Sequence, residues 1–280
     1  MTTTTEARLT HVTSRDGTRI AVFVSGQGRP LVLVPGTTAD HTTWRLVLPH
    51  LEPHVAVHAV DRRGRGSSGD GPTYSLEQEF EDIAAVVDAA AAATGGPVDL
   101  FGHSFGGNVA FGAATLTGNV RRLVLYEGWP VPNIDHRAVS PETMSRLESL
   151  LSEGRREELL ETMYRELVKM APEEIAAIKA APTWPARVAA AHTVPREVRA
   201  FGSQAFDPTM AARIPAPVLL LVGGETPQEV RADPEVVADA LPDARIRELE
   251  GHAHVAYLSA PEAFAAELLS FLGARSPLKE

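Results

Sequence analysis

The sequence lacks several features that define whole classes of protein. It has no cysteine among its 280 residues, which excludes disulfide bonds, thiolate metal sites and cysteine nucleophiles. It has no apolar run near the roughly 20 residues that span a bilayer. Residues 1–8, MTTTTEAR, lack the basic start and apolar core of a secretory signal. We therefore expect a cytoplasmic protein without a membrane partner.

Positive charge is also scarce. The chain has 26 Lys and Arg against 36 Asp and Glu, which gives a formal net charge of −10. Its tightest basic group is Arg62, Arg63 and Arg65, which is too small for the basic surface that binds nucleic acid or anionic lipid. The composition therefore predicts that the protein has no nucleic-acid partner.

The sequence does contain short apolar runs that alternate with helical patterns. Continuous apolar runs are typical of strands covered on both faces. Their alternation with helices predicts an α/β fold with a mostly parallel central sheet flanked by helices. Strands are expected at 9–13, 18–24, 31–34, 55–60, 98–101, 123–126, 218–222 and 245–249.

The strand pattern stops between residues 129 and 214, where the apolar residues follow helical spacing instead. We therefore expect two parts. The core is formed by residues 1–128 and 215–280, and a helical cap of residues 129–214 is inserted before the last two strands.

A serine lies where the strand at 98–101 must turn sharply into a helix. The surrounding sequence is Gly102-His103-Ser104-Phe105-Gly106. The glycines permit backbone angles that a side chain would forbid. Such a turn holds the serine hydroxyl at the tip of a strand, with the N–H of the next residue facing the same point.

Four motifs make the chain resemble the α/β-hydrolase fold family over nearly its whole length. They correspond to the family's oxyanion loop, a glycine-rich loop, the nucleophile elbow and the histidine loop. In chain order they are Pro35-Gly36-Thr37-Thr38, Asp61-Arg62-Arg63-Gly64-Arg65-Gly66-x-Ser68, Gly102-His103-Ser104-Phe105-Gly106-Gly107, and Gly251-x-x-His254 followed by Pro261. The predicted helical segment occupies the position of the family's variable cap.

The resemblance implies a serine hydrolase with Ser104 as nucleophile and His254 as base. A serine hydroxyl is a weak nucleophile until a histidine accepts its proton, and a carboxylate must fix the tautomer of that histidine. The resemblance further assigns the oxyanion hole to the N–H groups of Thr37 and Phe105, because the developing negative charge needs two donors.

Two glutamates are candidates for the triad acid. The family usually places an aspartate three residues after the glycine that ends the strand before the last, but that position here holds Thr226. Glu225 lies one residue earlier. Glu127 ends the strand after the elbow, which is the family's other position for the acid. We prefer Glu127 and keep Glu225 as the alternative.

The sequence departs from the family in the oxyanion loop as well. Pro35 stands where the family commonly has histidine, and a proline offers no N–H, so the support of this loop must differ. No metal site is expected at His252-x-His254, which lacks further ligands at short spacing. No organic cofactor is implied.

Together these features predict cleavage of a small-to-medium apolar carboxylic ester, thioester or lactone through an acyl-enzyme on Ser104. The serine argues against the epoxide hydrolase and haloalkane dehalogenase branches, which use an aspartate at the elbow. The alternative is a repurposed scaffold, either a non-hydrolytic cyclase or lyase or a ligand-binding protein. The candidate substrate-binding residues are Thr38, His41, Trp129 and Trp184.

Overall fold

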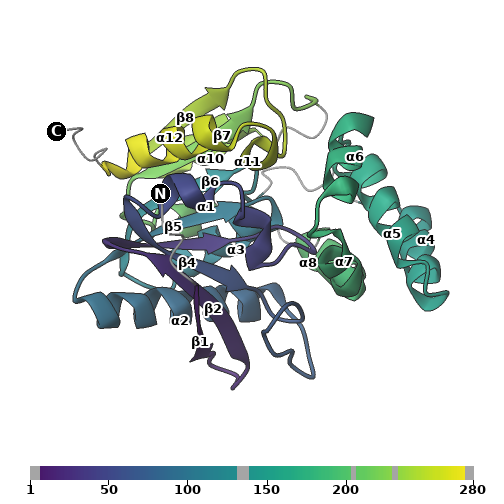
Figure 1. The fold of residues 1–280 in the computed structure, drawn as a ribbon, viewed down its shortest axis with the longest axis horizontal. Coiled ribbons are helices and arrows are strands. Elements are labelled where there is room, and N and C mark those ends of the chain that lie inside the picture. The colour runs from purple at the N-terminus through teal and green to yellow at the C-terminus, as the bar shows by residue number, and fades with distance from the viewer. Residues whose placement is uncertain (1–6, 131–138, 203–205, 229–232, 275–280) are drawn as a thin grey trace.

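One sheet organises the fold (Figure 1). The computed structural model describes residues 7–130, 139–202, 206–228 and 233–274. The eight strands lie in the order β1-β2-β4-β3-β5-β6-β7-β8. Their bounds are β1 Arg8–Thr13, β2 Arg19–Gly26, β3 Arg29–Val34, β4 Val55–Asp61, β5 Val98–His103, β6 Val120–Tyr126, β7 Val218–Gly223 and β8 Ala244–Leu249. The predicted strands are confirmed, with their ends shifted by a few residues.

The sheet is antiparallel only at its N-terminal edge. β2 pairs antiparallel with both β1 and β4, whereas the strands from β4 through β8 pair in parallel. The carboxyl ends of parallel strands meet at the same edge of a sheet, which is where ligands bind in open α/β folds. The segments that follow β3, β5, β6 and β7 therefore converge at this edge.

Helices connect the strands and cover both faces of the sheet. α2 begins at the predicted capping box, in which Ser75 N donates to Gln78 Oε1 at 2.9 Å and Gln78 N donates to Ser75 Oγ at 3.3 Å. The helix bounds are η1 His41–Trp44, α1 Leu48–Leu51, α2 Leu76–Thr94, α3 Phe105–Ala114, α4 Pro141–Ser152, α5 Arg156–Thr162, η3 Met163–Leu167, α6 Pro172–Ala180, α7 Trp184–Ala189, η4 Ala190–Thr193, α8 Val194–Gly202, α9 Pro208–Ala211, α10 Pro234–Ala240, α11 Ala256–Ser259 and α12 Pro261–Leu272.

Two apolar layers lie on opposite faces of the sheet. Successive strand residues point to opposite faces, so Leu100 of β5 joins the layer under α2 and α3, while Phe101 joins the layer under α12. Burying one such side chain contributes about 1.5–3 kcal/mol to folding. The central strands are thus fixed from both sides, and their carboxyl ends are rigid supports for a site.

Between β6 and β7, every described element is helical. Figure 1 shows the helices of residues 141–202 together at the right of the view, beside the sheet. Of the predicted cap, residues 131–138 and 203–205 lie outside the described part of the chain. We refer to the described residues from 139 to 211 as the helical segment.

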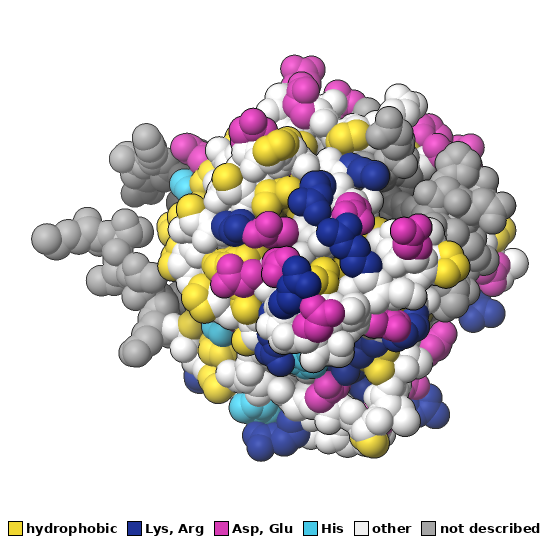
Figure 2. Space-filling view, turned by 90° about the vertical axis from the view of Figure 1, so that its right-hand side faces the viewer, with side chains coloured by type: hydrophobic (Ala, Val, Ile, Leu, Met, Phe, Trp, Pro, Cys, Tyr) yellow, Lys and Arg dark blue, Asp and Glu magenta, His cyan; other side chains and the backbone are white. Residues whose placement is uncertain are grey.

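The outer surface of the helical segment carries both signs of charge. Figure 2 shows acidic and basic side chains interspersed on this face, with hydrophobic groups in small separate patches. Many of these charges are paired, as in Arg146–Glu166 at 2.8 Å and Arg155–Glu158 at 2.6 Å. None of the described helices combines the length and apolarity needed to cross a bilayer.

Candidate active site

Ser104 forms the turn between β5 and α3. Its backbone has φ 53° and ψ −129°, a strained conformation for a residue with a Cβ. Ser104 N donates to Tyr126 O at 2.9 Å, which fixes the turn to the end of β6. Two positions packed around this turn must be glycine. A Cβ on Gly106 would lie 2.4 Å from Pro35 O, and a Cβ on Gly128, after β6, would lie 1.9 Å from Ser104 O. The local sequence therefore builds the predicted elbow.

Above Ser104 lies a cavity of about 380 Å³. This volume suits a small molecule. The loops after β3, β5, β6 and β8 supply one wall, with Thr37, Ser104, Phe105 and His254 among the lining residues. The helical segment supplies the opposite wall, whose apolar side chains are Met163, Leu167, Val168, Met170, Val198 and Phe201.

The carboxylate of Glu127 orients the His254 ring. Its Oε2 lies 2.7 Å from Nδ1 of His254, and its Oε1 accepts hydrogen bonds from Gly223 N at 2.8 Å and from the Thr226 hydroxyl. Burial alone would raise the pKa of Glu127. The hydrogen bonds and the imidazole charge outweigh burial and leave that pKa below its ordinary value. An ionised Glu127 accepts only, so Nδ1 of His254 carries the proton and Nε2 is free to accept one.

Glu225, the alternative acid, is exposed on the surface. Its backbone N donates to His252 O at 3.0 Å, and none of its recorded contacts reaches His254. The structure therefore brings Glu127 to the histidine. Thr226, in the position where the family usually has an aspartate, instead donates its hydroxyl to Glu127. Sequence reasoning missed this role, although the position of Thr226 marked it.

His103 is a second site residue that sequence reasoning missed. It is buried beside Ser104, and its Nε2 lies 2.9 Å from His254 O. Burial, followed by the charges of His254 and Arg187, lowers the pKa of His103 well below its ordinary value despite this hydrogen bond. The neutral ring therefore donates from Nε2 and holds the loop that carries His254. The sequence signal that could have identified His103 was its position directly before Ser104 in the elbow motif.

The Ser104 hydroxyl and the His254 ring are not hydrogen-bonded to each other in this structure. Ser104 and His254 line the same cavity, but the Ser104 hydroxyl makes no hydrogen bond to any described residue. Such contacts often tighten only when substrate is bound. Of the contacts expected between Ser104, His254 and Glu127, the structure has the one between His254 Nδ1 and Glu127 Oε2.

The oxyanion loop is supported through its carbonyl groups. Arg62 donates from Nε to Pro35 O at 2.9 Å and from Nη2 to Gly36 O at 3.2 Å. Pro35 has no N–H to offer, and the guanidinium provides the alternative support. Thr37 and Phe105 both line the cavity, and neither backbone N–H has an acceptor among the described residues. Both N–H groups are therefore available to donate to a molecule bound in the cavity.

A buried cluster of charges ties the helical segment to this loop. Arg62 lies 2.8 Å from Glu79 of α2 and 3.1 Å from Glu197 of α8, and Arg65 also pairs with Glu197. Burial opposes ionisation, but the two arginines lower the pKa of Glu197 to about 2. In the sequence these arginines were visible as a short basic group within the glycine-rich loop motif. Their partners, Glu79 and Glu197, are distant in the sequence and are brought to them only by folding.

Three of the four predicted substrate-binding residues lie behind the cavity wall. Thr38 is fully buried, with Oγ1 3.4 Å from the Tyr164 hydroxyl. Trp129 packs in the apolar layer under α2 and α3, and Trp184 packs against the other layer. None of the three lines the cavity. The structure differs from the sequence expectation because other residues of the helical segment form the apolar wall.

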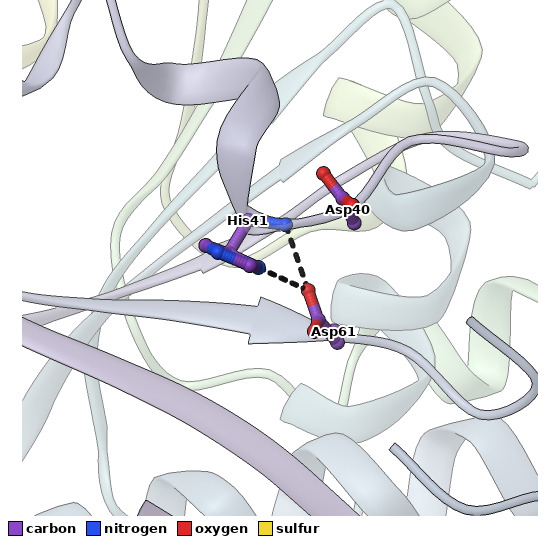
Figure 3. Close-up of side chains that lie close together, drawn as sticks. All are labelled: Asp40, His41 and Asp61. Carbon is purple, nitrogen blue, oxygen red and sulfur yellow. Dashed lines mark hydrogen bonds and ion pairs between the residues drawn. The ribbon is translucent and has the colours of Figure 1, made fainter. Parts of the chain in front are cut away.

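His41, the fourth of these residues, faces Asp61 and does not line the cavity either. Figure 3 shows His41 N and Nδ1 both directed at Asp61 Oδ1, each at 2.8 Å. The ring also stacks on Phe23, with centroids 3.4 Å apart. His41 therefore joins the oxyanion loop to the glycine-rich loop.

Asp40, His41 and Asp61 form the one group of three potential metal ligands found in the described residues. Their oxygens already have donors within the protein. Asp61 Oδ2 accepts from Ser67 N at 2.8 Å, and Asp40 Oδ1 accepts from Thr42 N at 3.0 Å. These bonds account for the cluster as a structural network.

Comparison with known proteins identifies similar sequences and structures. A family model, the Alpha/beta hydrolase family, matches residues 31–267. The crystal structure of an alpha/beta hydrolase from Sphaerobacter thermophilus is 37% identical, with a TM-score of 0.81 over 94% of this chain and 100% of that chain. A thermophilic esterase from Thermogutta terrifontis, 24% identical, shares the fold with a TM-score of 0.68 over 95% of this chain and 98% of that chain.

The curated relatives include an enzyme that is named for its reaction. N-formylmaleamate deformylase of Pseudomonas putida is 38% identical over 115 residues, which are 40% of this chain. The match spans 42% of the length of that relative. The similarity therefore concerns less than half of either protein.

Proposed function

The chain belongs to the α/β hydrolase family, and from this premise we propose that it is a serine hydrolase that cleaves a small-to-medium carboxylic ester, thioester or lactone. Ser104 is the nucleophile, His254 the base and Glu127 the acid. The observation that carries the proposal is the 2.7 Å bond from Glu127 to His254, beside an elbow serine on the same cavity.

In the first half of the reaction, Ser104 Oγ attacks the carbonyl carbon and its proton passes to His254 Nε2. Glu127 stabilises the imidazolium that forms. The carbonyl oxygen becomes an oxyanion that faces the N–H groups of Thr37 and Phe105. Loss of one such donor typically costs about 2.7–4 kcal/mol of transition-state stabilisation. His254 then protonates the leaving alcohol, thiol or ring oxygen, and the acyl group stays on Ser104.

In the second half, water replaces the alcohol. His254 Nε2 accepts a proton from the water, whose oxygen attacks the acyl carbon, and collapse of the second oxyanion returns the proton to Ser104. The helical segment acts as a cap that covers this chemistry. Its apolar side chains face the part of the substrate that does not react, and Met163 and Val198 are among them.

Covalent labelling tests the nucleophile without knowledge of the substrate. The intact mass is measured after incubation with a fluorophosphonate, for the wild type, Ser104→Ala and the control Ser140→Ala. Ser140 also lines the cavity, so the control keeps a similar environment. We expect a single adduct on the wild type and on Ser140→Ala, and none on Ser104→Ala.

Absence of an adduct on a folded wild-type protein would refute an activated Ser104. The repurposed scaffold, as a cyclase, a lyase or a ligand-binding protein, would then be the better account. After a positive result, a panel of esters, thioesters and lactones identifies the reaction. N-formyl amides join the panel because one relative is a deformylase. Ser104→Ala should lower kcat on the best substrate by about 10⁶-fold.

A further inference from the structure

Arg187 is a buried cation on the wall of the candidate active site. It lies on α7 of the helical segment, is 6% exposed, and lines the same cavity as Ser104. An arginine side chain remains protonated at any ordinary pH. The cavity therefore contains a full positive charge that the proposed mechanism does not use.

The recorded partners of this guanidinium are neutral hydroxyl groups. Nη2 donates to Thr43 Oγ1 at 2.8 Å, and Nη1 donates to the Tyr164 hydroxyl at 3.4 Å. Burial opposes the charge of Arg187, but the hydroxyls of Tyr164 and Tyr257 outweigh burial and raise its pKa. Among the described residues, no carboxylate forms an ion pair with Arg187. The other buried arginines each have at least one carboxylate partner, and they are Arg62, Arg63 and Arg65.

The carboxylates that line the cavity are engaged elsewhere. Glu127 binds His254, Glu166 pairs with Arg146, and Glu197 pairs with Arg62 and Arg65. Glu174 caps its own helix by accepting from Ala171 N at 3.2 Å. None of these groups supplies the counter-charge of Arg187.

From this imbalance we infer that Arg187 binds a carboxylate of the substrate. Burial of a charge without a counter-ion costs several kcal/mol, and a bound anion removes that cost. One guanidinium among neutral hydroxyls matches a monoanion, and its planar fork matches a carboxylate. The inference rests on the proposed function, since it places the carboxylate in the cavity where Ser104 attacks. The substrate is then an ester or related acyl compound that carries a carboxylate beyond an apolar spacer.

Paired substrates test this inference through turnover. The methyl hemiesters of succinic, glutaric and adipic acid carry a carboxylate, and the corresponding methyl ester amides have the same shape without the charge. The wild type should prefer the hemiester of the best length by about 10- to 100-fold in kcat/KM, mainly through KM. Arg187→Gln should remove this preference by weakening the hemiester alone, and Arg187→Lys should keep part of it.

The matched control is Arg155→Gln, which removes an exposed arginine of the same helical segment and should keep the wild-type preference. An equal loss on hemiester and amide in Arg187→Gln would assign Arg187 a structural role and overturn the inference. A wild type that turns over both substrates equally would overturn it as well.

A binding measurement separates failure of the inference from failure of the proposed function. Calorimetric titration with glutarate should show binding to the wild type at least 10-fold tighter than to Arg187→Gln, whether or not Ser104 reacts. Fluorophosphonate labelling without this difference would retain the serine hydrolase and refute the carboxylate site. The difference without labelling would retain the carboxylate site and refute the hydrolase.

Discussion

Two arginines buried on either side of the candidate active site differ in one respect. Arg62, beneath the oxyanion loop, is fully buried and lies between Glu79 and Glu197. Arg187, on the cavity wall, is nearly as buried but contacts hydroxyl groups. The fold supplies both the cation and the carboxylates at Arg62, so this ion pair is structural. At Arg187 the described residues supply only the cation, and we assign the anion to the substrate.

Glu127 belongs with Arg62 in this comparison, because it is a buried charge whose partner is in place. Replacing it by glutamine keeps the shape but allows the wrong tautomer of His254. We expect Glu127→Gln to lower kcat by about 10⁴-fold, the largest effect among the charge variants. The matched control is Glu225→Gln, an exposed glutamate two residues beyond the end of β7, which should keep wild-type kcat. An equal loss in both variants would show that the bond at Glu127 is not the orienting contact.

The second expected effect is on stability. Arg62→Met removes a cation and leaves Glu79 and Glu197 buried with fewer partners. Removing one member of a buried ion pair typically costs about 3–5 kcal/mol, so the free energy of unfolding in urea should fall by about that amount. Loss of the support for Pro35 O and Gly36 O should also slow fluorophosphonate labelling in the native protein.

An exposed arginine with two carboxylate partners provides the control for Arg62→Met. Arg155 lies 2.8 Å from Glu153 and 2.6 Å from Glu158 on the surface. Exposed pairs contribute little, because solvent screens them, so Arg155→Met should leave the urea midpoint nearly unchanged. If both variants lost the same stability, burial would not be what makes the Arg62 cluster important.

Local pattern was sufficient for the sheet and for two residues of the candidate site. The parallel strands other than β8 are short, mostly apolar runs, and Ser104 and His254 follow strands within recognisable motifs. The sequence alone did not decide between Glu127 and Glu225, because the answer depends on which strands are neighbours in the sheet. β6 and β7 are neighbours in the sheet, which brings Gly223 and Thr226 to the side chain of Glu127.

The residues that line the cavity wall could not be predicted from the local sequence pattern. Trp184 and Arg187 lie on the same short helix, but Trp184 is partly buried against the apolar core while Arg187 lines the cavity. Which residues of α7 line the cavity is decided by tertiary packing. The inference about Arg187 depends on its having no carboxylate partner among the described residues. A sequence does not show which charges remain without an ion pair after folding.

The smallest expected effect is the one that most sharpens the comparison. Arg187→Met removes a buried charge that has no counter-ion in the described part of the chain, which relieves a desolvation cost of several kcal/mol. It also removes hydrogen bonds from the charged guanidinium to Thr43 and Tyr164, each worth about 1.5–3 kcal/mol net, and their loss offsets this relief. We expect urea unfolding to give a stability close to that of the wild type, in contrast to Arg62→Met. Glutarate should raise the urea midpoint of the wild type and leave that of Arg187→Met unchanged. A loss as large as that of Arg62→Met would make both arginines parts of the scaffold, and the distinction between a completed pair and one completed by ligand would fail.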